Sequence, residues 1–475
     1  MRFLRPTRQA LAAAALTTLA ACAGLPEGGA LPTPRAPAAA PQAFAAPVAD
    51  WPADAWWRAY GDAQLDALIA EALAGAPSIA TAQARLAKAE SLVQTARAAR
   101  LPQLSADGSV AEQRQSLNYL SPAAVTPHGW HDTGRATLDF SRDLDFWGRN
   151  RAAFAAALSD AEAARADAAQ ARLMLASSIA AAYAEFARLN AAEDTAVAAL
   201  EVRAKSVALF RERRAHGLET LGGVRQVEAR RAMAEADLLS LREQLALQRN
   251  RLAALAGDGP QRGLALAPPA GASLRAFGVP ADLPAALLGR RPDVVAARLR
   301  VEAAGGRIDS ATAAFYPNVN LAAFVGVQSL GLDVLAHGGS VVGSVGPAIS
   351  LPVFDGGRLR GQLRGARADY AAAVASYDQA VVQALQDVAD VAASERALGG
   401  ELARTAEGVA ASREAWEIQR RRYEGGLANA LDVLDAEDGW LSNRRAQTDL
   451  QSRAFALDVA LQRALGGGYA SATRS

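Results

Sequence analysis

The sequence has very little of what most catalytic and metal-binding proteins use. Its 475 residues include one cysteine, four histidines and three methionines, and aromatic residues make up only 6%. A single thiol cannot form a disulfide framework within the chain. The sequence has no Ser-His-Asp, Cys-His or phosphate-loop arrangement, and its histidines have no cluster of acids or cysteines beside them. We therefore expect no enzymatic activity, no metal and no non-covalent cofactor.

A strong net charge is also absent. Fifty lysines and arginines are balanced by 49 acids, which leaves a formal net charge of +1. A nearly neutral chain lacks the basic surplus that attracts nucleic acid, so we expect no nucleic-acid partner. Alanine, arginine, leucine and glutamate instead dominate the middle and the end of the chain, as is typical of long packed helices.

The N-terminus has the pattern of a targeting segment. Three arginines precede a short apolar run at residues 11–21, which is too short to span a bilayer as a stable helix. Leu19-Ala20-Ala21-Cys22 has the form of a bacterial lipobox, although an ordinary Ala-x-Ala cleavage site is the alternative. We predict a signal peptide over 1–21 and a covalent lipid, such as palmitate, on Cys22, which anchors the mature chain without spanning the membrane. An aspartate directly after Cys22 would indicate retention in the inner membrane. The chain has Ala23 at this position, which favours the outer membrane.

The rest of the chain is built as a duplication. Three glycines recur 209 residues later: Gly148 as Gly357, Gly217 as Gly426, and Gly257 as Gly466. A register kept this closely indicates two copies of one unit whose helix lengths matter. We predict a lipidated N-terminus with a Pro/Ala-rich tether, a first repeat, a linker or equatorial segment, a second repeat and a C-terminal tail, over 22–50, 51–257, 258–290, 291–466 and 467–475.

Each repeat contains two long helical stretches. No proline or glycine interrupts the chain between Gly148 and Gly217, and about 69 residues in a helix reach roughly 100 Å. Such a length exceeds that of globular helices, and no part of it is apolar enough to cross a membrane, so we expect coiled-coil-like helices on the water side. The predicted helices lie at about 148–216, 220–256, 357–425 and 429–465.

Between the helical stretches the hydrophobic period changes to two. Apolar residues alternate with polar ones over Leu104–Val110 and again over Val319–Val327. Strands of about ten residues with one apolar face match those of membrane barrels. We predict strands at about 103–113, 134–142, 318–328 and 342–352.

Four strands cannot enclose a pore by themselves. In lipid, the backbone groups at their outer edges would stay unpaired, at a cost of several kcal/mol each. We therefore expect several copies of the chain to share one closed barrel. Two copies give a filled eight-stranded barrel and three give a twelve-stranded barrel with a lumen, and the residues alone do not choose between them.

A series of short motifs occurs in order along the mature chain. They are Trp56-Trp57 with Gln64–Ile69, Leu144–Arg149, Leu288–Asp293, Phe315–Pro317, Leu351–Arg358 and Leu431–Ala436. Together with the lipobox, they resemble the TolC-like outer membrane factors, in particular the lipidated NodT-type efflux transporter outer membrane subunits. The resemblance implies a mainly α fold with a membrane β-barrel portion, in which a homotrimer forms one twelve-stranded barrel continued by an α-helical tunnel across the periplasm.

The same resemblance implies the outer-membrane exit duct of a tripartite efflux pump. Small toxic solutes would pass from an inner-membrane efflux pump, through a periplasmic adaptor (membrane fusion) protein and this duct, to the exterior. The protein would be lipid-anchored and barrel-inserted in outer membrane lipid and would extend into the periplasm. The alternatives are a type I-like protein secretion duct and a pore-less structural periplasmic lipoprotein, although a strut of that kind needs no strands with an apolar face.

Two acids mark the start of the last long helix. Asp432 and Asp435 lie three residues apart, hence on one helix face. Their counterparts in the first repeat are Gly223 and Gln226, so a purely local need for acids near the helix N-terminus does not explain them. The resemblance implies that such acids ring the periplasmic end of the tunnel and that a tyrosine matching Tyr423 helps hold the tips closed.

One position departs from the family pattern. The best-known member has an arginine in this turn, where the present chain has Ala428. A closing salt bridge is therefore missing or differently built, with Arg421 or Arg422 as the candidate substitute.

Both turns share the pattern Arg-x-x-x-Gly-Leu. Gly217 and Gly426 are natural helix ends, because glycine adopts the left-handed conformation at little cost. Leu218 and Leu427 either cover these turns or serve as docking knobs for the adaptor. From the resemblance we predict that these four residues form the docking tips.

Overall fold

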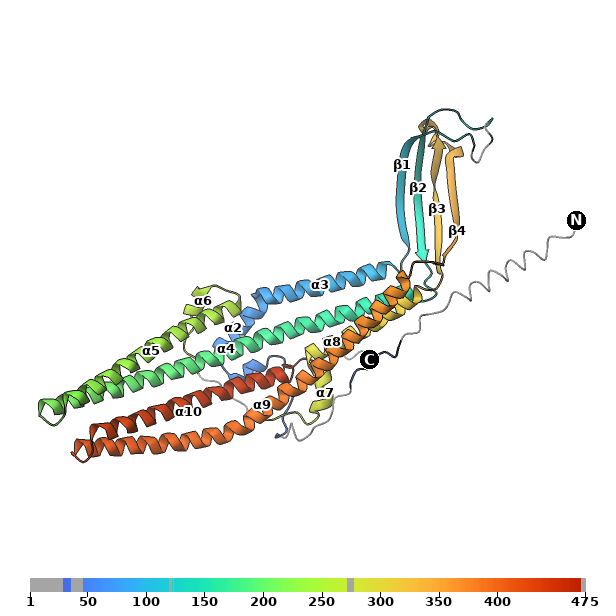
Figure 1. Ribbon diagram of the computed structural model, residues 1–475. Coiled ribbons are helices and arrows are strands. Elements are labelled where there is room, and N and C mark those ends of the chain that lie inside the picture. The colour runs from blue at the N-terminus through green and yellow to red at the C-terminus, as the bar shows by residue number, and fades with distance from the viewer. Residues whose placement is uncertain (1–28, 36–45, 119–121, 123, 271–276, 471–475) are drawn as a thin grey trace. The chain divides into compact units, whose positions relative to one another are not determined.

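The computed structural model describes the chain outside residues 1–28, 36–45, 119–121, 123, 271–276 and 471–475 (Figure 1). The predicted signal peptide and its lipidation site Cys22 lie outside the described residues. The chain divides into two compact units. We name them the strand unit (Met1–Pro34, Leu86–Ala164 and Ala297–Tyr377) and the hairpin unit (Arg35–Arg85, Arg165–Ala296 and Asp378–Ser475).

The strand unit contains one four-stranded antiparallel sheet in the order β1-β2-β3-β4 (Figure 1). Its strands are β1 (Gln103–Gln113), β2 (His131–Asp143), β3 (Asn318–Leu330) and β4 (Val341–Ser350). Pairing sets these bounds: β2 begins at His131, three residues before the predicted start, because His131 still pairs with Gln113. At the other end of the sheet, β4 stops at Ser350 because its partner Asn318 is the first residue of β3.

The register places most of the large apolar residues of the four strands on one face, although Phe324, which pairs with Asp139 and Ser344, lies on the other. Leu104 pairs with Phe140 on β2, and Phe140 pairs with Ala323 on β3. Ala323 in turn pairs with Val345 on β4, and alternate residues of a strand face the same side. The large apolar residues of this face are exposed in the single chain, namely Leu104, Val110, Leu138, Val325, Val341, Val345 and Ile349. A soluble domain would bury such a face, so the described chain is incomplete without a partner or a lipid environment.

Four long helices form two hairpins (Figure 1). The first hairpin is α4 (Arg149–Ala215) followed by α5 (Leu221–Ala256), and the second is α9 (Arg358–Glu424) followed by α10 (Ala430–Ala464). The helices α4 and α9 each have 67 residues, which fits a duplicated unit in which helix length is maintained. Both begin in the strand unit and end in the hairpin unit.

The N-terminal segment joins the hairpin unit through a buried core. It forms η2 (Trp56–Tyr60) and α2 (Ala63–Gly75). Asp62 caps α2 by accepting hydrogen bonds from the amides of Gln64 and Leu65, and the hydroxyl of Tyr183 on α4 donates to Asp62 at 2.8 Å. Buried residues around this cap include Trp56, Tyr60, Leu65, Leu68, Ile69, Ile179, Phe186, Leu252 and Phe455.

Shorter elements complete the chain. They are α3 (Pro77–Ala98), α6 (Pro260–Leu264), α7 (Leu283–Arg290), α8 (Pro292–Ala313), η3 (Leu332–Val334) and η4 (Gly338–Ser340). Among the described residues, no single helix has both the length and the apolar character to cross a membrane, and α2 and α3, bent by 41° at their junction, pass that test only as a pair. The predicted fold class, a duplicated and mainly α chain with four β-strands, is confirmed.

A buried arginine ties three helices of the hairpin unit together. Arg291, which lies between α7 and α8, donates to Asp293 at 2.6 and 3.1 Å. It also donates to Asp387 on α9 at 2.8 Å and to the carbonyl of Ala464 on α10 at 3.4 Å. The planar guanidinium can satisfy several acceptors at once, which an ammonium group cannot do in the same geometry.

We predict that Arg291→Met destabilises the hairpin unit. Removing one partner of a buried ion pair commonly costs about 3–5 kcal/mol, and we expect about 2 kcal/mol here because both carboxylates keep some contact with solvent. The measurement is the urea midpoint of denaturation in detergent. Arg298→Met is the matched control, since the ion pair of Arg298 with Glu302 is about half exposed and such pairs contribute little. Equal midpoints for the two variants would contradict the prediction.

Candidate functional site

The predicted docking residues lie in two turns of the same construction. Gly217 and Gly426 both have φ of 74°, the left-handed conformation that ends a helix. The amide of Leu218 donates to the carbonyl of Arg213 at 2.9 Å, and the amide of Leu427 donates to that of Arg422 at 2.7 Å. The two leucine side chains are 64% and 73% exposed. The turns therefore satisfy their own backbone groups and leave both leucines available to solvent.

Tyr423 is the residue that links the two hairpins at their tips. Its side chain is buried, and its ring stacks on Phe210 of α4 with centroids 5.1 Å apart. Its hydroxyl donates to Glu219 in the first turn at 2.7 Å. The guanidinium of Arg213 lies 4.2 Å from the ring centroid and donates to the Tyr423 carbonyl at 3.1 Å. One tyrosine of the second hairpin thus has three contacts with the first.

The electrostatics of this link favour a neutral tyrosine and an ionised glutamate. Burial and the neighbouring Glu219 raise the pKa of Tyr423 well above its usual range. Burial acts to raise the pKa of Glu219, but hydrogen bonds from Tyr423 and Thr220 outweigh it, so the pKa of Glu219 is lowered. The hydrogen bond therefore joins a neutral donor to a charged acceptor, the stronger kind of side-chain hydrogen bond.

The predicted gate acids occupy different surroundings. Asp432 completes a capping box at the start of α10: its amide donates to the Asn429 side chain at 2.9 Å, and its carboxylate accepts from the Asn429 amide at 3.2 Å. Asp435 is mostly exposed and pairs with Arg230 of α5 at 3.6 Å. In the first hairpin the side chain of Thr220 caps α5 by accepting from the Gly223 amide. The Thr220 amide donates to Glu219 at 2.7 Å, so Glu219 takes the place that Asp432 has in the second hairpin.

The arginines considered as substitutes for the missing family arginine do not reach these acids within the chain. Arg421 pairs with Glu417 at 4.0 Å, and Arg422 donates to the carbonyl of Leu427 at 3.4 Å. The partner of Asp435 is Arg230, on the other hairpin. Within one chain α5 thus supplies the arginine for Asp435, and a closing salt bridge made by Arg421 or Arg422 stays a prediction.

Sequence reasoning missed a second set of links between the hairpins. Asp438 of α10 accepts from Arg203 of α4 at 2.8 Å and from Arg230 of α5 at 2.6 Å. Glu437 is 1% exposed and accepts from the hydroxyl of Ser206 at 2.9 Å. Burial raises the pKa of Glu437, against the opposing effects of Ser206 and Arg203. The sequence offers a weak signal, since Asp435 and Asp438 share one helix face.

Apolar packing holds these polar links in place. The buried cluster at the tips consists of Val207, Phe210, Val224, Val227, Tyr423, Val433 and Leu434. It draws on all four long helices, so separating the hairpins exposes this cluster as well as breaking the links. Among the described residues, no group of three or more His, Cys, Asp or Glu side chains is placed to hold a metal ion. Apolar packing and polar links together hold the tips of the two hairpins against each other.

The family comparison matches both repeats. The family model described as "Outer membrane efflux protein" matches residues 68–258 and 283–467. These two segments correspond to the two copies of the duplicated unit, and together they cover well over half of the chain.

Two similar proteins have names that refer to resistance against toxic compounds. The chain is 41% identical to the fusaric acid resistance protein FusA of Burkholderia cepacia over 327 residues, which cover 67% of this chain and 61% of FusA. It is 33% identical to the multidrug resistance outer membrane protein MdtP of Escherichia coli K12 over 430 residues, which cover 88% of this chain and 87% of MdtP.

Solved structures agree over nearly the whole fold. The crystal structure of the outer membrane protein VceC from Vibrio cholerae superposes with a TM-score of 0.84 at 48% identity, covering 88% of this chain and 100% of VceC. The outer-membrane channel OprN superposes with a TM-score of 0.85 at 30% identity, covering 93% of this chain and 99% of OprN. The chain therefore belongs to the outer membrane efflux protein family and is an efflux duct of the outer membrane.

Proposed function

We propose that three copies of this chain assemble into one duct whose twelve strands close into a barrel. The observation that carries the proposal is the four-stranded sheet. Its apolar face is uncovered, and its edge strands β1 and β4 pair only with β2 and β3 within the chain. Unpaired edges are not tolerated in lipid, so the edges must pair between copies. Three copies leave a lumen, whereas the eight strands of two copies would fill it.

The duct works between two further proteins in this proposal. A periplasmic adaptor binds the helical tips, and an inner-membrane efflux pump supplies small toxic solutes, which then pass through passively. The names of FusA and MdtP support such cargo, because they refer to fusaric acid and multidrug resistance. The lipid on Cys22 belongs to the proposal as a second anchor in the outer membrane.

The tips act as the gate. Tyr423 and Glu219 hold the two hairpins of one chain together, and Arg230 adds a second link through Asp435 and Asp438. Three exposed copies of Asp432 and Asp435 at the narrow end would attract cations and repel anions. Opening then requires the hairpins of each chain to separate, which breaks these links.

Channel recordings of the wild-type protein and of a variant without the charges of Asp432 and Asp435 test the duct and the acidic gate together. We expect the wild-type protein to be a trimer in detergent and to open cation-selective channels in a planar bilayer. Asp432→Asn with Asp435→Asn should lower the cation preference, and the asparagine at 432 keeps an acceptor for the capping box. Glu407→Gln, at another exposed acid, is the control and should leave selectivity unchanged. A monomer without conductance would overturn the duct, and unchanged selectivity would overturn the acidic gate.

A second prediction concerns the tyrosine link. Tyr423→Phe keeps the stacked ring but removes a hydrogen bond to a charged group, a loss of about 1.5 kcal/mol. We expect the fraction of time that the channel is open to rise about tenfold, as measured by single-channel recording. Tyr183→Phe is the matched control, since it removes the hydrogen bond to Asp62 in the separate N-terminal core. Equal effects of the two variants on opening would show that Tyr423 has only a structural role.

A third prediction concerns docking. Leu218→Asp with Leu427→Asp should reduce adaptor binding about tenfold or more in a pull-down with purified adaptor, because each change puts a charge into an apolar contact. Stability should change little, since both side chains are exposed. Adaptor binding at the wild-type level would place the docking surface elsewhere on the chain.

A further inference from the structure

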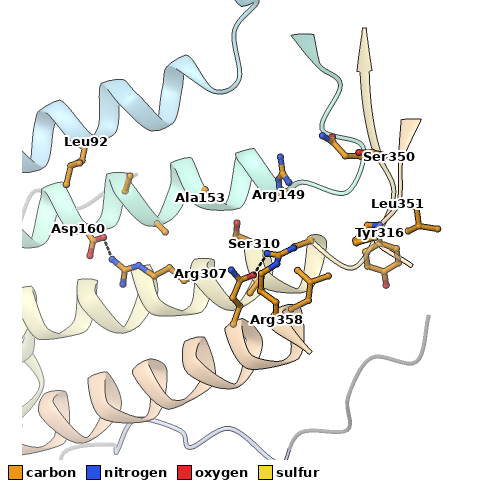
Figure 2. A pocket seen from close by; sticks show the side chains of 18 of the residues that line it. Leu92, Arg149, Ala153, Asp160, Arg307, Ser310, Tyr316, Ser350, Leu351 and Arg358 are labelled. Atoms are coloured by element: carbon orange, nitrogen blue, oxygen red, sulfur yellow. Dashed lines mark hydrogen bonds and ion pairs between the residues drawn. The ribbon is translucent and has the colours of Figure 1, made fainter. Parts of the chain in front are cut away.

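The strand unit contains a groove at the junction between its sheet and its helices (Figure 2). Its volume is about 860 Å³. Residues of α3, α4, α8 and α9 line it, together with the ends of β3 and β4. A groove of this size is large enough for a small organic molecule.

The groove continues the polar face of the sheet. Asn318 and Ser350 line it and are register partners at the end of the β3–β4 ladder. By the alternation of strand residues, Ser350 lies on the same face as Ser344, opposite to the face that carries Val345. If the apolar face is turned to lipid, as in the proposed barrel, the groove opens toward the lumen. This step rests on the proposed function.

Arginines dominate the charge of the groove. Arg149 of α4, Arg307 of α8 and Arg358 of α9 line it, and Asp160 is the acid among its lining residues (Figure 2). Arg307 is paired with Asp160. Arg149 pairs with Asp143, at the end of β2, at 3.2 Å. Because a guanidinium has five N–H donors, each of these pairs leaves donors available for a further acceptor.

Arg358 is the arginine with the fewest anionic contacts. Within the described residues it donates to the side-chain oxygen of Gln362 at 3.3 Å and has no carboxylate within ion-pair distance. The carboxylate of the nearby Asp355 accepts hydrogen bonds from the backbone amides of Leu359 and Gly357. These bonds, with some help from the charge of Arg358, lower the pKa of Asp355, which is therefore fully ionised at neutral pH. The exposed guanidinium of Arg358 remains available to an incoming anion.

The rest of the lining suits the body of an organic solute. Leu92, Leu351 and Leu359 supply apolar surface, and Ser310 and Tyr316 add hydroxyl groups. A guanidinium matches the two oxygens of a carboxylate in a fork geometry. We propose that this groove binds small organic carboxylates in transit through the duct, with Arg358 as the primary ligand and Arg149 and Arg307 as supporting charges.

Direct binding tests the site without relying on transport. Equilibrium dialysis of the detergent-purified assembly with labelled benzoate should give saturable binding, and benzamide, which has the same ring but no charge, should bind at least tenfold more weakly. Arg358→Gln should weaken benzoate binding about fivefold, the scale of one partly exposed charge contact. Arg360→Gln, at an exposed arginine of α9 outside the groove lining, is the matched control.

Several results would overturn the proposal. One is equal binding of benzoate and benzamide, and another is equal weakening by Arg358→Gln and Arg360→Gln. Inorganic phosphate that competes at the same concentration as benzoate would assign the groove to small anions in general and overturn the organic ligand. The bilayer recordings remain separate, so a conducting trimer without benzoate binding would refute this site and leave the duct in place.

Discussion

The rest of the structure depends on the unpaired edges of one sheet. A soluble protein can protect an edge strand with charges or water, but a strand in lipid has neither, and each unpaired backbone group costs several kcal/mol. The described part of the chain provides one sheet of four strands with an apolar face, and both edges of this sheet lack a partner strand there. Several copies must share one barrel to close those edges, and three copies, unlike two, also leave a lumen. The helical tunnel then needs the same symmetry as the barrel it continues.

The duplication gives the chain two hairpins of the same construction, and residues that differ between the two copies form the link between them. At the 209-residue offset, Tyr423 corresponds to Arg214, and Glu219 corresponds to Ala428. The link between the hairpins therefore uses one residue from each copy that its counterpart lacks. A homodimer-like pair of identical hairpins would have either two such links or none. Because this link occurs once per chain, Tyr423 and Glu219 form an asymmetric contact between the hairpins, beside the ion pairs of Arg230 with Asp435 and Asp438.

The fold was accessible from sequence because its signals are local. Period-two alternation, uninterrupted helical stretches and glycines at the turns mark each element within a few residues, and the repeat confirms the register. Of the tip residues, Tyr423, Asp432 and Asp435 are predicted through the family resemblance. Glu219, Arg230 and Glu437 were missed because their partners lie on the other hairpin, about 200 residues away. Such contacts leave no periodicity in the sequence, so only the packed structure identifies them.

The carboxylates of Glu437 and Glu219, both at the tips, have pKa values shifted in opposite directions, so they take up protons at different pH. The pKa of Glu437 is raised by burial, so its ionised form opposes folding, and this cost is relieved first as the pH falls. The pKa of Glu219 is lowered, so its contribution is fully present above its unfolded pKa and is lost only when the pH falls through the lower folded value. Mild acid should therefore neutralise Glu437 while Tyr423 still donates to a charged Glu219. The hydrogen bond between Tyr423 and Glu219 therefore keeps its charged acceptor at a pH at which Glu437 has already taken up a proton.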